Sequence, residues 1–232
     1  MSRGSKLSLW IAAIAFLGWR ASACSSNSSG PAADFTVAVD TPTATTLGTQ
    51  VVLHVHLAST GDSGDVVLHV TGADTSWDVT LPVGPVTLTT NGQKSANVLI
   101  AVPTNGASAP TGRSVTVDAA IGSLHHSAAT SVTVANQLVI PIQRGAGAGT
   151  ASHWPFANST TFHLNAGTMV TFRNDDTLGH IIHSNGAIGI AHQAIGSPTL
   201  PGDTYSQTTS GSGSALVTCH SHVADTLFFA IP

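Results

Sequence analysis

Two short segments near the C-terminal end carry side chains that could bind a metal ion. The first, from Val170 to Asp176, leads into Gly179 and His180, and the second is the later run 219–222, Cys-His-Ser-His. The spacing Cys219-x-x-His222 places a soft thiolate and a borderline imidazole on one short loop. The chain has no Gly-x-Ser-x-Gly motif, so this Cys and His indicate metal binding and not nucleophilic catalysis.

The ordered combination resembles the cupredoxins, the family of plastocyanin and azurin. In that family an early His follows a strand of the type Phe-x-Asn-x-Asp, which residues 172–176 match, and a late Cys-x-x-His pair lies between the last two strands. The resemblance implies one type 1 copper ion, Cu+ or Cu2+, held by His180, Cys219 and His222. Two His and one Cys suit both oxidation states, so electron transfer requires little reorganisation.

The axial position departs from the family pattern. No methionine follows His222, and Leu227 stands at the plastocyanin-like spacing, five residues later. Gly179, directly before His180, matches the azurin-like Gly whose carbonyl approaches the metal. We therefore expect copper that is three-coordinate or weakly bound by a carbonyl, with a higher reduction potential than in a Leu227→Met variant.

The neighbouring histidines are predicted to have lesser roles. Because side chains alternate along a strand, His183 and His220 should point away from the metal. His192, in the loop that follows, could reach the copper region and is a minor candidate ligand.

A second group of histidines lies earlier in the chain. If residues 50–58 and 65–71 form a hairpin, His54, His56 and His69 share an outer face and could bind Cu(II) or Zn(II). We interpret this face as an ordinary solvated one. His125 and His126 are predicted to lie in a turn, without a role.

The residues that surround these groups predict an all-β protein. Short runs of alternating apolar and polar residues are separated by turn residues every eight to twelve positions. The runs cover residues 35–39, 50–58, 65–71, 77–81, 86–88, 95–102, 114–120 and 128–134, and then 137–143, 161–164, 168–174, 180–184, 204–209, 215–219 and 227–231.

We predict two domains after a linker. Residues 35–136 resemble bacterial Ig-like modules, with Asp34-Phe35-Thr36-Val37 at the start and Pro110-Thr111-Gly112 before the penultimate strand, and this resemblance implies an Ig-like β-sandwich that acts as a spacer. Residues 137–232 form the predicted cupredoxin domain, a plastocyanin-like Greek-key β-sandwich.

Composition excludes some classes of protein. The chain has seven basic and eleven acidic side chains, no Glu and two Lys, which is unfavourable for amphipathic helices. It lacks the basic patches and aromatic platforms of nucleic-acid-binding proteins. Catalysis by paired carboxylates is no better supported, since Asp175-Asp176 is most simply interpreted as a turn.

The N-terminus reads as a secretory signal over residues 1–23, followed by a Ser-rich linker over residues 24–34. The segment that ends at Cys24 also resembles a lipobox, and this resemblance implies a lipid on Cys24 that anchors the protein to a bacterial membrane. The expected location is secreted or periplasmic.

The sequence as a whole predicts a non-enzymatic carrier of single electrons between redox partner proteins. Leu178, Val223 and Leu227 are candidates for an apolar docking surface near His222. The alternatives are a copper-binding or delivery protein, a subunit of a copper oxidase or nitrite-reductase-like enzyme, which would need a second copper, and a metal-free module.

Overall fold

A computed structural model describes residues 32–104, 112–145, 154–185, 187–220 and 222–232, without the side chains of 222–224. The predicted signal segment, Cys24 and most of the predicted linker lie outside the described residues. From Ala33 onward the described residues belong to one compact unit.

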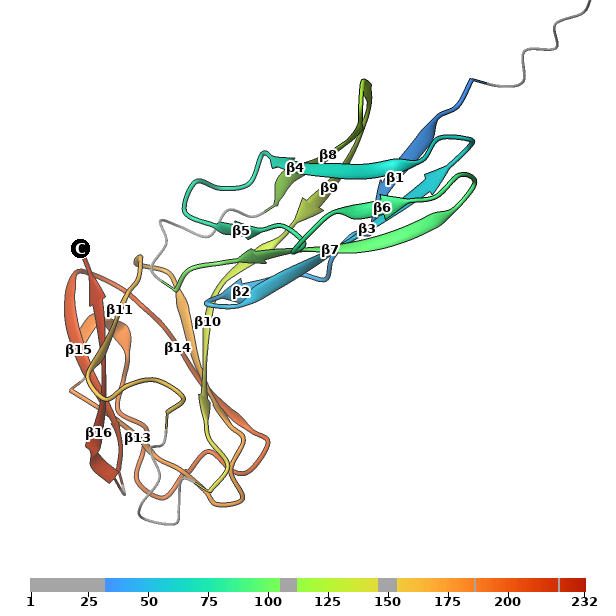
Figure 1. Ribbon diagram of the computed structural model, residues 1–232. Helices are drawn as coiled ribbons and strands as arrows, with labels where there is room; N and C mark the ends of the chain where they lie inside the picture. Colours follow the sequence, from blue (N-terminus) through green and yellow to red (C-terminus); the bar gives the residue numbers. More distant parts are fainter. Residues whose placement is uncertain (1–31, 105–111, 146–153, 186, 221) are drawn as a thin grey trace, which may run out of the picture. The chain divides into compact units, whose positions relative to one another are not determined.

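Two antiparallel four-stranded sheets are built from the first part of the chain (Figure 1). One has the order β1-β3-β7-β5, with bounds Phe35–Val39, Gln50–Ser59, Gln93–Ala101 and Asp78–Thr80. The other has the order β6-β4-β8-β9, with bounds Val86–Leu88, Gly64–Thr71, Arg113–Ile121 and Leu124–Val132. Since β3 and β4 belong to different sheets, residues 50–58 and 65–71 do not form the hairpin that a shared histidine face would require.

Two further sheets are mixed, and one of them contains Cys219 and His222. The sheet β14-β12-β10-β2 comprises Thr204–Thr208, Met169–Asn174, Val134–Ile142 and Thr45–Leu47, and β10 runs parallel to both of its neighbours. The sheet β11-β16-β15-β13 comprises Thr160–His163, His222–Ile231, Gly213–Cys219 and Ile182–Ser184. A 3-10 turn, Ala187–Gly189, follows β13.

Alternation of side chains explains why these segments form sandwiches. In β3, Leu53, Val55 and Leu57 are buried while His54 and His56 are exposed. In the later sheets the rings of Phe162 and Phe229 stack 5.3 Å apart, and Phe172 meets Phe229 edge-on at 6.2 Å. Each fully buried side chain of this size contributes about 1.5–3 kcal/mol to folding. The all-β sandwich fold predicted from the sequence is confirmed.

Some boundaries differ from the predicted ones. Strand β10 runs without a break across the predicted domain boundary at residues 136/137, so the division into two domains stays a prediction. His125 and His126 lie in β9 and not in a turn, because they pair with Ala120 and Ala119 of β8. Among the described residues, no helix has the length and apolar character needed to cross a membrane.

Candidate metal centre

His180 occupies a buried position fixed through its backbone. His180 follows the loop after β12. Its backbone N–H donates to the carbonyl of Thr199 at 3.0 Å, and its carbonyl accepts the N–H of Thr199 at 2.8 Å. The loop is held by the buried amide of Asn174, which donates to the carbonyls of Leu178 and Thr199 at 2.7 and 2.8 Å. These hydrogen bonds hold the backbone before and after His180, and so fix the point from which its side chain projects.

Asp176 determines which nitrogen of His180 carries the proton. The Nε2 atom of His180 donates to the carboxylate of Asp176 at 2.9 Å, and the two side chains are 3 % and 1 % exposed. The other carboxylate oxygen accepts the N–H of Gly145 at 2.7 Å. With its proton on Nε2, a neutral imidazole keeps a lone pair on Nδ1. The interpretation of Asp176 as a simple turn residue was therefore incomplete; its i, i+4 spacing to His180 was the available signal.

Cys219 is the partner of that lone pair. Its thiol is free and its side chain is fully buried, and Sγ lies 3.4 Å from Nδ1 of His180. The residue ends β15, where it is paired with Ile182 of β13. The structure thus brings together two of the three predicted ligands, a thiol sulfur and an imidazole nitrogen with an available lone pair.

The backbone of His222, the third predicted ligand, lies opposite Cys219. The two residues are register partners at the start of β16, and the pairing is irregular at this point, since the preceding residue Thr218 pairs with Thr226. The side chain of His222 lies outside the described part of the structure. Its role as a ligand stays a prediction.

The two predicted axial groups have clear packing roles. Leu227 is fully buried in β16 opposite Val217, on the face of the sheet to which Cys219 also points. The prediction that Leu227 belongs to an exposed docking surface is therefore wrong, whereas Leu178 is 52 % exposed. The side chain of Val223, the other predicted member, lies outside the described part of the structure. Gly179 lies against Pro198, whose Cβ would be 3.2 Å from a Cβ added at position 179.

The contacts of the buried pair raise the pKa of His180 above its ordinary value. The hydrogen bond with Cys219 raises the pKa of His180, burial opposes the shift, and the hydrogen bond with Asp176 adds to it. A metal ion bound to Nδ1 would occupy the lone pair that a proton otherwise takes. This donor set suits a cation that prefers sulfur and nitrogen, and the chemistry of the residues fits copper.

The structure unites three histidines for which the sequence predicted only minor or outward positions. His183 and His220 point outward, as predicted, while His192 lies beside them and not toward the buried pair. Their candidate ligand nitrogens all lie within 4.8 Å of one another.

The earlier group of histidines does not form such a set. His54 and His56 contact Asn97 and Ser95 of the neighbouring strand β7, and His56 Nε2 also contacts Asp40 at 3.0 Å. His69 lies in the other sheet near Asp118. His54, His56 and His69 do not share one face that could bind a metal, because β3 and β4 do not pair.

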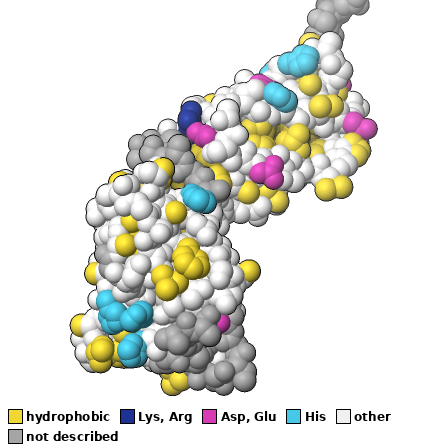
Figure 2. All heavy atoms as spheres, turned by 90° about the vertical axis from the view of Figure 1, so that its left-hand side faces the viewer, with side chains coloured by type: hydrophobic (Ala, Val, Ile, Leu, Met, Phe, Trp, Pro, Cys, Tyr) yellow, Lys and Arg dark blue, Asp and Glu magenta, His cyan; other side chains and the backbone are white. Residues whose placement is uncertain are grey.

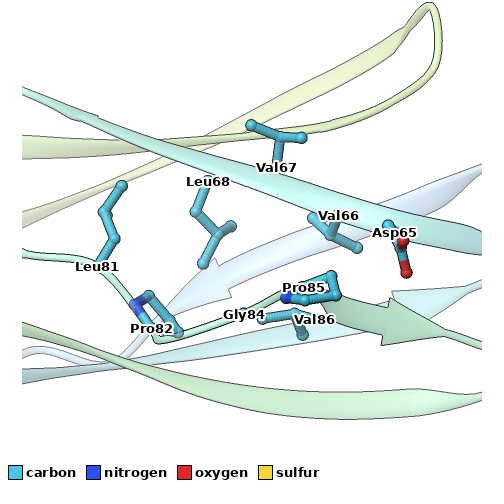
Figure 3. A pocket seen from close by; sticks show the side chains of 9 residues that line it. All are labelled: Asp65, Val66, Val67, Leu68, Leu81, Pro82, Gly84, Pro85 and Val86. Atoms are coloured by element: carbon cyan, nitrogen blue, oxygen red, sulfur yellow. The ribbon is translucent and has the colours of Figure 1, made fainter.

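A hollow in the first part of the chain lies between β4 and the segment 81–86 (Figure 3). Its lining is mostly apolar and includes Leu68, Leu81, Pro82 and Pro85. Asp65 is the ionisable side chain in this lining, and its carboxylate accepts the Thr87 hydroxyl at 2.7 Å. This hollow offers no arrangement of groups for catalysis.

Comparison with known proteins gives a structural likeness only. No protein-family model and no curated protein matches the chain. A purple cupredoxin from Nitrosopumilus maritimus is 23 % identical, with 40 % of this chain and 98 % of that chain covered and a TM-score of 0.33. Two amicyanin variants, one a Cu(I) form and one oxidised, are 18 % and 19 % identical, with 42 % and 41 % of this chain and 83 % and 81 % of theirs covered, each with a TM-score of 0.31.

Proposed function

We propose that this chain is a type 1 copper protein that carries single electrons between extracytoplasmic redox partners, with His180, Cys219 and His222 as copper ligands. The observation that carries the proposal is the buried contact of 3.4 Å between His180 Nδ1 and Cys219 Sγ, with Nε2 of the same ring held by Asp176. Bound copper would supply one-electron redox chemistry, and these residues would hold it.

The burial of the pair favours electron transfer over catalysis and over metal delivery. Cys219 is 0 % exposed and His180 is 3 % exposed, so a substrate has no direct access to the sulfur. A catalytic cysteine is ordinarily at least partly exposed. A delivery protein must release its metal readily, which a closed site disfavours. Electrons, in contrast, can pass through a thin layer of packed side chains.

The surface near His180 is suited to a protein partner. Leu178 and Leu200 are 52 % and 54 % exposed, and both flank the paired segments that hold His180. Cδ2 of Leu200 would lie 3.7 Å from a Cβ added at Gly179, so this part of the surface is apolar and closely packed. Small apolar surfaces of this kind are typical of transient docking between redox proteins.

The test is a comparison of the copper-loaded protein with its Cys219→Ser variant. We expect one copper that gives an intense thiolate-to-copper charge-transfer band and an EPR signal, both lost in the variant, and a reversible one-electron wave in voltammetry. A matched control is His163→Ala, since His163 is exposed on β11 outside the site and should leave the band unchanged.

The proposal fails if the wild-type protein shows no such band, or if the band survives in Cys219→Ser. A band with an irreversible wave and rapid loss of Cu(I) to a chelator would instead support metal delivery.

A further inference from the structure

A cluster of three histidines lies on the outer side of the sheet that contains Cys219. His183 is in the middle of β13, His220 follows the last residue of β15, and His192 comes from the loop after the 3-10 turn. The ring centroids of His183 and His192 are 4.5 Å apart, and that of His220 is 6.0 and 6.3 Å from theirs. Figure 2 shows histidine side chains gathered together on the molecular surface.

Backbone hydrogen bonds hold together the three segments that carry these histidines. The N–H of His220 donates to the carbonyl of Ile181 at 2.8 Å, and the N–H of Gln193 donates to the carbonyl of Ile182 at 2.9 Å. The buried Gln193 side chain also accepts the N–H of Ile182 at 2.9 Å. The histidines beside these anchors are therefore held close together by the fold, and their approach does not depend on the rings alone.

The rings present nitrogens that can bind a metal. Nδ1 of His192 lies 2.5 Å from the carbonyl of Gln193, which can only accept, so the proton is on Nδ1 and Nε2 keeps a lone pair. A carbonyl contact of this kind is the usual support of a metal-bound imidazole. Within the described part of the chain, the ring nitrogens of His183 and His220 make no hydrogen bond, so both rings are available as ligands.

A buried polar atom lies on the same face of the sheet. Thr218 is the register partner of His183 and precedes His220 by two residues, so its side chain shares their face. It is 3 % exposed, and its hydroxyl has no hydrogen-bond partner within the described residues. A buried hydroxyl without a partner is destabilising, and it indicates a missing polar group such as water or a hydrated ion.

We propose that His183, His192 and His220 form a second metal site, distinct from the buried pair, that binds a divalent transition-metal ion, with Cu(II) preferred. Three neutral imidazoles suit Cu(II) and Zn(II), and Cu(II) binds most tightly in the general order of affinities. In the square-planar geometry that Cu(II) prefers, nitrogens in adjacent positions lie about 2.9 Å apart, given metal–nitrogen bonds of about 2.0–2.1 Å. Since the ring nitrogens lie within 4.8 Å of one another, they would have to approach by at most about 1.9 Å, which small rotations of surface side chains allow.

The site does not depend on the copper centre proposed above, and the test separates the two. In a Cys219→Ser protein, which lacks the thiolate, we measure Cu(II) binding by equilibrium dialysis and the number of coordinated nitrogens by EPR. We expect one Cu(II) bound through imidazoles. Replacement of His183, His192 or His220 by Ala in this background should weaken binding by at least about tenfold, since even loss of a ligand's supporting hydrogen bond costs about 10–100-fold.

The matched control is His69→Ala in the same background, because His69 is an exposed strand histidine outside the cluster. It should leave Cu(II) affinity unchanged. The proposal is overturned if the three cluster variants bind Cu(II) as tightly as the Cys219→Ser parent, or if binding is lost in His180→Ala while the cluster variants retain it. Circular dichroism of each variant verifies that the sheets are intact.

Discussion

The hydrogen bond between Asp176 and His180 leads to a quantitative prediction about copper affinity. Asp176→Ala removes a buried carboxylate that accepts the Nε2 proton of His180 at 2.9 Å. The ring then loses the group that fixes its tautomer and raises its basicity. Loss of such a partner costs about 10–100-fold in metal affinity, and we expect the upper end because neither side chain is screened by solvent.

Asp176→Asn should have a smaller effect than Asp176→Ala. An amide oxygen can still accept the Nε2 proton, but a hydrogen bond to a charged acceptor is roughly twice as strong as a neutral one. We therefore expect a loss of about tenfold in copper affinity, which corresponds to about 1.4 kcal/mol. The measurement is competition with a chelator of known affinity, carried out for Cu(I) and Cu(II) separately.

The adjacent Asp175 gives the matched control. It is exposed, and its two carboxylate oxygens each accept from Arg173 at 2.7 Å, so Asp175→Asn changes the same charge without touching His180. Equal copper affinities for Asp176→Ala and Asp175→Asn would refute the reasoning. A second readout is independent of copper: nitrogen-15 NMR of the neutral apo protein should find the His180 proton on Nε2, and a proton on Nδ1 would contradict the assignment.

Three further predictions concern other parts of the chain. Leu227→Met, a substitution of similar volume at a fully buried position, should lower the reduction potential of bound copper and cost less than about 1.5 kcal/mol of stability; an unchanged or higher potential in voltammetry would exclude a thioether contact. Phe229→Ala should lower the free energy of unfolding by about 3–5 kcal/mol in urea titrations, since its ring packs between Phe162 and Phe172; a loss below about 1 kcal/mol would show that this packing matters little. Hydrogen bonds from the Ser76 backbone and hydroxyl, followed by the charge of Arg113, lower the pKa of Asp74 below 3.8. Asp74 therefore stabilises the fold above its unfolded pKa, and this contribution disappears as the pH falls through its folded pKa. The melting temperatures of wild type and Asp74→Asn should differ at neutral pH and converge in strong acid, and a difference that stays constant with pH would argue against this reasoning.

Alternation of side chains made most strands predictable, because one buried face imposes a period of two on the sequence. Strands β3 and β8 lie within one residue of the predicted runs at each end. Strand β2 was missed because Thr45–Leu47 is too short to show a period and is defined by its parallel pairing with β10, far along the chain. Whether β3 pairs with β4 could not be decided from the sequence, because alternation indicates which face is buried but not which strand lies beside it.

The candidate site was predictable where a short sequence motif contains the ligand residues. His180 and Cys219 were chosen from the sequence, and their nitrogen and sulfur lie 3.4 Å apart. The cluster of His183, His192 and His220 was not predicted, although the outward direction of two members was. The path of the loop that carries His192 depends on hydrogen bonds made by Gln193, and no periodic pattern reports them.

The irregular pairing at the end of β15 has a consequence for how related sequences can differ in length. From Thr218 to Cys219 the register advances one residue on β15, while on β16 it moves from Thr226 to His222, so the β15–β16 register passes over residues 223–225. An insertion or deletion among these residues can be absorbed by the bulge, so the remainder of β16 keeps its register. A change in length at positions 220–221 would instead displace His222 from its place opposite Cys219. Divergence in chain length is therefore expected on one side of His222 and not on the other.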